Sequence, residues 1–242
     1  MSNTGTEHTV KAFDTDINEL RGMVAEIGGR SEQAISKAMR ALEKHDLKLA
    51  EEVVAEDKLI DDLEQRIDDL TFQTIALRAP MADDLRELIA TFKISGVVER
   101  IGDYAKNIAK RVPVIASTHK LGPASLLPSM SNIASQLVRD SLEAFARRDA
   151  DLALEVSERD QIVDDFYTSI FRSVITYMIE NPKDIGEAAH LLFIAKNLER
   201  IGDHATNVAE MVYFAAKGEP MPERDRGENP TDLLEEPSGD NE

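Results

Sequence analysis

The sequence predicts an all-α protein made of two tandem, structurally similar three-helix bundles. Aromatic residues are only 5% of the 242 residues and tryptophan is absent, whereas strands enrich aromatic and β-branched side chains. Apolar residues recur at helical spacing, for example at Leu85, Leu88, Ile89 and Phe92. The second half of the chain also repeats the first, which predicts two similar units.

Prolines locate the breaks between the predicted helices. Pro80 and Pro182 each separate one apolar-periodic stretch from the next, and a segment rich in proline and glycine lies between Val112 and Met130. Proline lacks a backbone donor and ends or kinks a helix, so each position marks a boundary. The predicted helices span residues 12–43, 47–78, 82–112, 127–147, 150–180 and 184–216.

The internal repeat is the most informative feature of the sequence. The segment Glu99–Ala109 reads ERIGDYAKNIA and Glu199–Ala209 reads ERIGDHATNVA, with eight of eleven positions identical. Upstream, Asp46–Asp62 matches Asp149–Asp165 at an offset of 103. The repeat predicts the domain organisation: a first bundle over 7–113, a linker over 114–126 and a second bundle over 127–216.

Composition excludes several classes of function. Forty-six acids and 28 bases give a net charge of −18, so polyanionic nucleic acids and membrane surfaces should repel the chain. The absence of cysteine removes disulfide scaffolds, thiolate metal sites and cysteine catalysis. The polar N-terminus and the lack of a long apolar stretch predict a soluble chain. Residues 217–242, rich in acids and proline, predict a disordered acidic tail.

Each half contains two acid pairs at i, i+4 spacing, which places both members of a pair on one helix face. The pairs lie along apolar rows and recur at matching places in both halves. If the second and third helices of each half are adjacent, four carboxylates converge in each half. The eight candidate residues are Asp57, Asp61, Glu99, Asp103, Asp160, Asp164, Glu199 and Asp203.

Such clusters need compensation, because two unit charges 4 Å apart repel by about 4 kcal/mol at an effective dielectric constant near 20. They must take up protons, open to water or bind cations. Iron, manganese, magnesium and calcium fit oxygen ligands, whereas a closed structural zinc site does not. A solvated acidic face is the plain alternative. His204 is either a nitrogen ligand or a hydrogen-bonded residue in the wall of the site. Gly102 and Gly202 predict close approach of a neighbouring helix.

The doubled ERIGDYAKNIA and ERIGDHATNVA segments, with DKLID and DQIVD upstream, resemble the PhoU family, and the resemblance spans residues 7–216. It implies a pair of three-helix bundles whose (E/D)xxxD motifs bind metal through the eight carboxylates named above. The implied ions are divalent or trivalent: iron, manganese, magnesium or zinc. One departure is Tyr104, where the second half has His204.

The resemblance also implies a function. PhoU-like proteins are regulators without enzymatic activity that link a phosphate-importing ABC transporter to a sensor histidine kinase. They keep phosphate-starvation genes off, restrain phosphate uptake and commonly form homodimers. The implied location is the cytoplasm, or the inner-membrane periphery through partners. The sequence has no Gly-rich loop ending in Gly-Lys-Ser/Thr, so ATP hydrolysis would fall to the ATPase subunit of the transporter.

Three alternatives stay open at this point. A ferritin-like di-iron oxidase requires two Glu-x-x-His motifs, and the chain has one, Glu187 with His190, which has no counterpart in the first half. A metal-free helical scaffold would leave the acids solvated. An accessory protein of a different phosphate permease would share the same fold and motifs.

Overall fold

The computed structural model of the chain describes residues 4–115 and 122–222, with side chains from residue 12 onward. The predicted acidic tail over 217–242 lies, from residue 223 on, outside the described residues. Of the predicted linker over 114–126, residues 116–121 also lie outside them.

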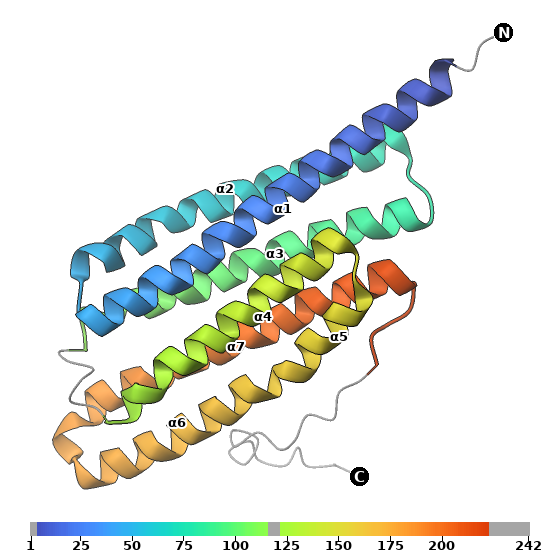
Figure 1. Cartoon of the computed structure of the whole chain (residues 1–242). Helices are drawn as coiled ribbons and strands as arrows, with labels where there is room; N and C mark the ends of the chain where they lie inside the picture. The colour runs from blue at the N-terminus through green and yellow to red at the C-terminus, as the bar shows by residue number, and fades with distance from the viewer. Residues whose placement is uncertain (1–3, 116–121, 223–242) are drawn as a thin grey trace, which may run out of the picture.

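The described residues form helices and contain no strand (Figure 1), which confirms the predicted fold class. Short 3₁₀ helices over Gly122–Leu126 and Pro182–Asp184 precede α4 and α7. The α-helices are α1 Thr4–Lys44, α2 Leu47–Arg78, α3 Asp83–Ala109, α4 Leu127–Arg147, α5 Ala150–Arg159, α6 Gln161–Glu180 and α7 Ile185–Lys217.

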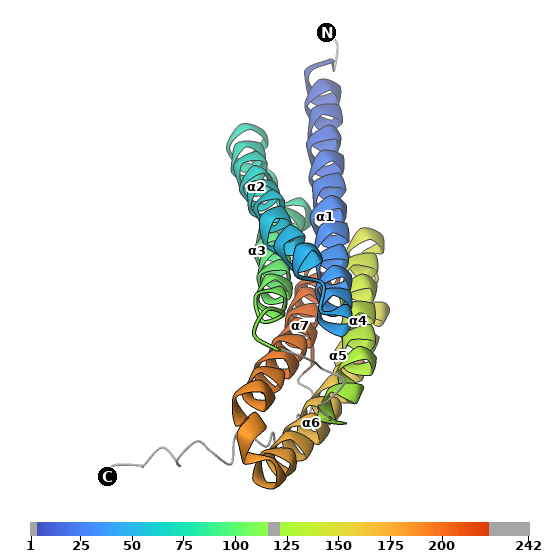
Figure 2. The same ribbon diagram turned by 90° about the vertical axis from the view of Figure 1, so that its left-hand side faces the viewer.

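The helices pack as two bundles that lie side by side. In the first, α1, α2 and α3 contact one another, and in the second α7 packs on α4, α5 and α6. The bundles are joined by contacts between α3 and α7 and between α1 and α4, as the two views in Figures 1 and 2 show. The turn between α2 and α3 and the turn between α6 and α7 lie at opposite ends of the molecule (Figure 1).

The repeat extends to the helix ends. The Asp46 side chain accepts a hydrogen bond from the Leu49 backbone N–H at 3.0 Å, and Asp149 accepts one from Leu152 at 3.0 Å. A side-chain acceptor at this position satisfies a backbone donor that the first helical turn leaves without a partner. Both turns before these caps use a left-handed residue, His45 or Arg148. The duplicated aspartates therefore start α2 and α5 in the same way.

One predicted helix is divided in two. The pattern over 150–180 predicted a single helix, but the chain turns at Asp160 between α5 and α6. The Asp160 carbonyl accepts a tight i, i+3 hydrogen bond from Val163 at 2.8 Å, and no proline or glycine marks the position. The predicted helix over 82–112 is also too long, because α3 ends at Ala109 and turns follow it.

The core is formed by apolar rows on the facing helices. Ile101, Ala105, Ile108 and Val112 of the first half are fully buried, as their spacing predicted. Each fully buried aliphatic side chain contributes about 1.5–3 kcal/mol relative to exposure. The upstream row behaves differently, because Leu88 is buried while Leu85 and Ile89 are exposed. That exposed stripe lies on α3 near the α2–α3 turn.

Charged groups also connect the two bundles. Glu87 of α3 is buried and pairs with Arg21 of α1 at 2.5 Å and with Arg148, which follows α4, at 3.4 Å. Arg139 of α4 donates to Glu32 of α1 at 2.8 Å. Among the described residues, no helix combines the length and apolar character that crossing a bilayer requires.

Candidate metal centres

The first carboxylate cluster lies between α2 and α3. Asp57, 7% exposed, faces α3, and the Lys106 ammonium donates to its Oδ2 atom at 2.5 Å. The same ammonium also donates to Asp103. Because one lysine contacts a carboxylate from each helix, the structure brings the α2 pair and the α3 pair together, as the adjacency of these helices predicted.

The charges of this cluster perturb one another. Burial, followed by the nearby carboxylates of Asp103, Asp61 and Glu64, raises the pKa of Glu99 from its ordinary value of 4.5 to about 7. Burial, followed by the charge of Asp57, likewise raises the pKa of Asp61. Burial works against the charged form of Lys106, yet its hydrogen bonds to Asp103 and Asp57 raise its pKa. The first cluster therefore concentrates negative charge around one ammonium.

The second cluster lies between the α5–α6 junction and α7 and is more deeply buried. Asp160 is fully buried and Glu199 is 2% exposed. The Lys196 ammonium donates to Glu199 Oε1 at 2.6 Å. Burial raises the pKa of Glu199, the hydrogen bond from Lys196 opposes that shift, and the charges of Asp203 and Asp164 add to it. The four predicted residues of this half are therefore also close together.

Two buried oxygens in the second cluster have no hydrogen-bond partner among the described residues. They are Glu199 Oε2 and the Thr206 hydroxyl. Buried polar atoms are normally satisfied, and leaving one without a partner costs about 1–3 kcal/mol. Each of these two oxygens could therefore accept one further interaction.

Two glycines allow the helices of each cluster to approach closely, as the sequence predicted. A Cβ atom added to Gly202 would lie 2.6 Å from Asp160 Oδ1, and one added to Gly102 would lie 2.8 Å from Ile60 Cδ1. Real side chains do not tolerate such distances without a shift of the neighbour. Gly202 thus creates the space that the buried Asp160 carboxylate occupies.

The position that differs between the repeats lies where the two bundles meet. The rings of Tyr104 and His204 pack edge to face with centroids 5.0 Å apart. His204 Nδ1 is 2.8 Å from the Arg200 carbonyl oxygen, and burial lowers the pKa of its imidazole. These contacts describe a hydrogen-bonded wall residue, the second of the two roles that the sequence left open.

Sequence reasoning missed Glu64, Lys106 and Lys196. Glu64 lies seven residues after Asp57, and Lys106 lies seven after Glu99, so each is two helical turns along the same face. Neither lysine is repeated in the other half. The counterpart of Lys106 is Thr206, and the counterpart of Lys196 is Gly96. A search for repeated residues alone therefore passes over them.

All protein ligands available in the two clusters are oxygens, which suits hard cations. Within residues 4–115 and 122–222, no three His, Asp or Glu side chains are already arranged to hold a metal ion. Binding would require the two ammonium groups to move away from Asp57 and Glu199. The metal-ligand roles of the eight carboxylates therefore remain a prediction.

The histidine of the single Glu-x-x-His motif, His190, contacts residues outside the two carboxylate clusters. His190 Nδ1 is 2.9 Å from an Arg111 Nη1 atom, and the His190 ring packs near Phe193. The histidine of this motif, which the di-iron alternative requires as a ligand, thus contacts Arg111 and Phe193.

The fold and the two clusters define a class of protein: duplicated three-helix bundles with one carboxylate cluster in each repeat. A comparison with protein families matches the PhoU domain at residues 24–112 and again at residues 127–212. The chain therefore belongs to the PhoU family.

Individual relatives agree with this assignment. The chain is 51% identical over 222 residues to a Zymomonas mobilis protein named phosphate-specific transport system accessory protein PhoU homolog, covering 92% of this chain and 94% of the relative. A Rhizobium meliloti protein with the same name is 42% identical, covering 93% and 94%. The crystal structure of PhoU from Pseudomonas aeruginosa is similar, with a TM-score of 0.81 and 34% identity, and covers 86% of this chain and 100% of that one.

Proposed function

We propose that this protein is a non-enzymatic accessory protein of a phosphate-specific transport system. The carrying observation is the two PhoU domains, together with relatives of that name at 51% and 42% identity over most of the chain. In this role it is a negative regulator of the phosphate-starvation response and restrains phosphate uptake. Its partners are the ATPase subunit of a phosphate ABC transporter and the sensor histidine kinase of the phosphate regulon.

The physical basis of partner binding is the charge of the two clusters. With compensating ions bound, the clusters would present positive charge and open coordination positions where they otherwise repel anions. The residues that would hold such ions are Asp57, Asp61, Glu99 and Asp103 in the first half. In the second half they are Asp160, Asp164, Glu199 and Asp203. Support comes from the raised pKa values of Glu99 and Glu199 and from the Glu199 Oε2 atom without a partner.

A pull-down from phosphate-replete and phosphate-starved cells tests this function. Wild-type protein should recover the transporter ATPase and the kinase, with recovery changing between the two conditions. Glu99→Ala/Asp103→Ala and Glu199→Ala/Asp203→Ala should each reduce recovery. The matched control is Glu155→Gln/Glu158→Gln, two exposed acids of α5 outside both clusters. Identical partner lists for all variants under both conditions would contradict the proposal.

A metal-free helical scaffold is the second candidate, and a specific observation favours it. Lys106 contacts Asp57 and Asp103, and Lys196 contacts Glu199, so each cluster already contains one compensating ammonium. Metal analysis of protein purified without chelators separates the two candidates. Lys106→Gln and Lys196→Gln sharpen the test, because a lysine that competes with a cation should weaken metal binding and its removal should tighten it.

An accessory of a different phosphate permease would give the same fold, clusters and family match. The same pull-down distinguishes it, because the transporter that is recovered would then be a permease without an ATP-binding subunit. Recovery of such a permease would keep the accessory role and replace the ABC transporter as its partner.

A further inference from the structure

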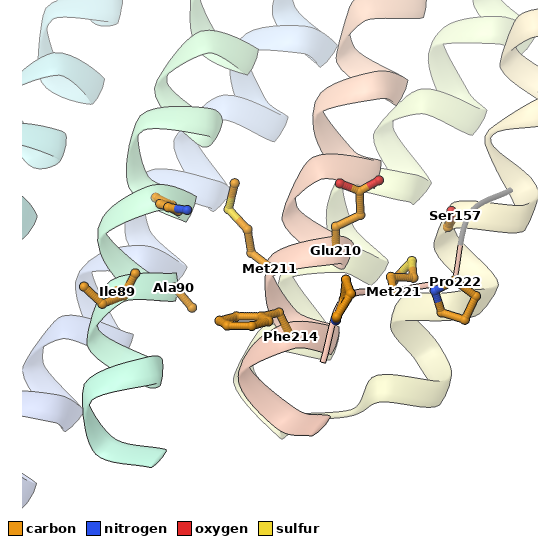
Figure 3. A pocket seen from close by; sticks show the side chains of 10 residues that line it. Ile89, Ala90, Ser157, Glu210, Met211, Phe214, Met221 and Pro222 are labelled. Carbon is orange, nitrogen blue, oxygen red and sulfur yellow. The ribbon is translucent and has the colours of Figure 1, made fainter. Parts of the chain in front are cut away.

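A groove of about 750 Å³ crosses the C-terminal half of α7 and reaches from α3 to α5. Its apolar lining includes Ile89 and Ala90 of α3 and Met211 and Phe214 of α7, and Figure 3 shows Phe214 pointing from α7 toward α3. Ile89 is 39% exposed and Phe214 is 41% exposed. Large apolar side chains exposed together in a concave surface indicate a binding site.

The duplication supplies an internal comparison for this groove. At the opposite end of the molecule, the equivalents of Met211 and Lys93 are Arg111 and Phe193. There the Arg111 guanidinium lies over the Phe193 ring, 4.2 Å from its centroid. It also contacts His190, the equivalent of Ala90, at 2.9 Å. The Phe193 ring thus has an internal cation stacked on one face, although 53% of the residue is still exposed, whereas within the described part of the chain no cation stacks on Phe214.

The chain itself passes along this groove. After α7 ends at Lys217, Pro220, Met221 and Pro222 form part of the groove wall, and Figure 3 shows Met221 and Pro222 beside α7 and α5. The twenty residues that follow contain eight acids and two bases, and Leu233 and Leu234 are their only large apolar side chains. These two leucines are flanked by Asp232 and Glu235.

We propose that Leu233 and Leu234 of the acidic C-terminal segment dock intramolecularly into this groove. Leu233 lies eleven residues beyond Pro222, a length that spans at most about 36 Å when extended and about 18 Å on average as a flexible chain. A tether of this length gives an effective concentration in the millimolar range, so a weak apolar contact is enough for docking. This inference does not depend on the transport function.

Charge determines how the docked segment is oriented in the groove. Lys93 of α3 lines the groove and is exposed, and the acids on either side of the two leucines are its complement. Glu210 is the acidic group on the groove and opposes a docked acid near it. The leucines therefore supply the affinity, and Lys93 selects the side of the groove on which their acidic neighbours lie.

Carbodiimide crosslinking of the full chain followed by mass spectrometry tests the proposal. The reagent joins an amine and a carboxylate that are in contact, so docking predicts a link between Lys93 and Asp232, Glu235 or Glu236. Leu233→Ser/Leu234→Ser should lower the yield of that link about tenfold or more, because the apolar contacts are lost while every charge is kept. Absence of the link in wild type, or an unchanged yield in the double variant, would overturn the proposal.

Two further comparisons complete the experiment. Phe214→Ser should lower the yield of the link, whereas Ile179→Ser, an exposed apolar residue on α6, should leave it unchanged. Equal losses in both variants would contradict a contact specific to the groove. Mixing ¹⁵N-labelled and unlabelled chains identifies the source of the segment. Links within one chain support the proposal, and links found only between chains overturn it in favour of a second copy as the occupant.

Discussion

The two halves of this protein carry the same carboxylates in different surroundings. In the first, Glu99 is half-buried, and a further acid, Glu64, raises its pKa. In the second, the position of Glu64 is occupied by Tyr167, whose buried ring lies near Lys196, and Glu199 is almost fully buried. Duplication therefore preserved the candidate ligands, while the residues around them set how much water reaches each cluster.

The lysines show the same divergence. Lys106 serves two carboxylates from its place on α3, whereas Lys196 on α7 serves the buried Glu199. Their counterparts, Thr206 and Gly96, carry no charge. The compensating ammonium group therefore occupies a different position in each half. This difference in the position of the lysines predicts that the two clusters respond unequally to equivalent substitutions.

Removal of the lysines should have the largest effect on this comparison. Lys196→Met leaves the Glu199 carboxylate buried without its cation, and we expect a loss of about 2–3 kcal/mol in the free energy of unfolding. Lys106→Met should cost about 1 kcal/mol, because the first cluster is more open to water. Urea denaturation of chelator-treated protein at pH 8 measures both. A larger loss of stability for Lys106→Met than for Lys196→Met would contradict the conclusion that the second cluster is the more deeply buried one.

Substitution of the glycines sharpens the same contrast. Gly202→Ala forces a methyl group against Asp160, a carboxylate that is fully buried, and should cost about 2 kcal/mol. Gly102→Ala meets the end of the flexible Ile60 side chain, so we expect a change of less than about 1 kcal/mol.

Gly29→Ala is the matched control for these helical glycines, because nothing lies within 4 Å of its added Cβ atom. It should stabilise the protein by about 0.5–1 kcal/mol through helix propensity. Thermal unfolding of the three variants provides the comparison. Equal effects at Gly102 and Gly202 would mean that the two helix contacts do not differ.

A third comparison concerns pH. Folding raises the pKa of Glu99 from 4.5 to about 7. Between these values the native state binds a proton that the unfolded state has lost, so this residue lowers stability as pH rises from about 4.5 to 7. Glu99→Gln mimics the protonated form and avoids that loss.

The stability of Glu99→Gln relative to wild type should therefore rise by about 1 kcal/mol between pH 5 and pH 8, a value reduced by solvent screening at this half-exposed site. Denaturation of metal-free protein across this range gives the measurement. Parallel stability curves for the two proteins would show that Glu99 titrates normally.

Much of the fold was predictable because its signals are local and repeated. Proline positions, helical periodicity and the duplicated Asp46 and Asp149 caps depend on neighbouring residues, and the family match followed from the ERIGD segments. The break at Asp160 was not predictable, since it contains no proline or glycine and arises where a buried carboxylate packs on α7.

The convergence of the acids followed from spacing once α2 and α3 were placed side by side. The compensating groups did not, because Lys106 and Lys196 occupy different places in the two repeats and act across helices. The exposure of Leu85 and Ile89 was also missed, since periodicity identifies an apolar face without saying what covers it.

Metal stoichiometry tests the central claim, that each half holds its own cation site, most directly. Metal-free protein is titrated with Mn²⁺ and the bound ions per chain are counted by electron paramagnetic resonance. The proposal predicts that wild type binds Mn²⁺ in both halves. Glu99→Gln/Asp103→Asn should lose only the ions bound in the first half, and Glu199→Gln/Asp203→Asn only those bound in the second half. No bound Mn²⁺ in wild type, or the same stoichiometry in all three proteins, would contradict it.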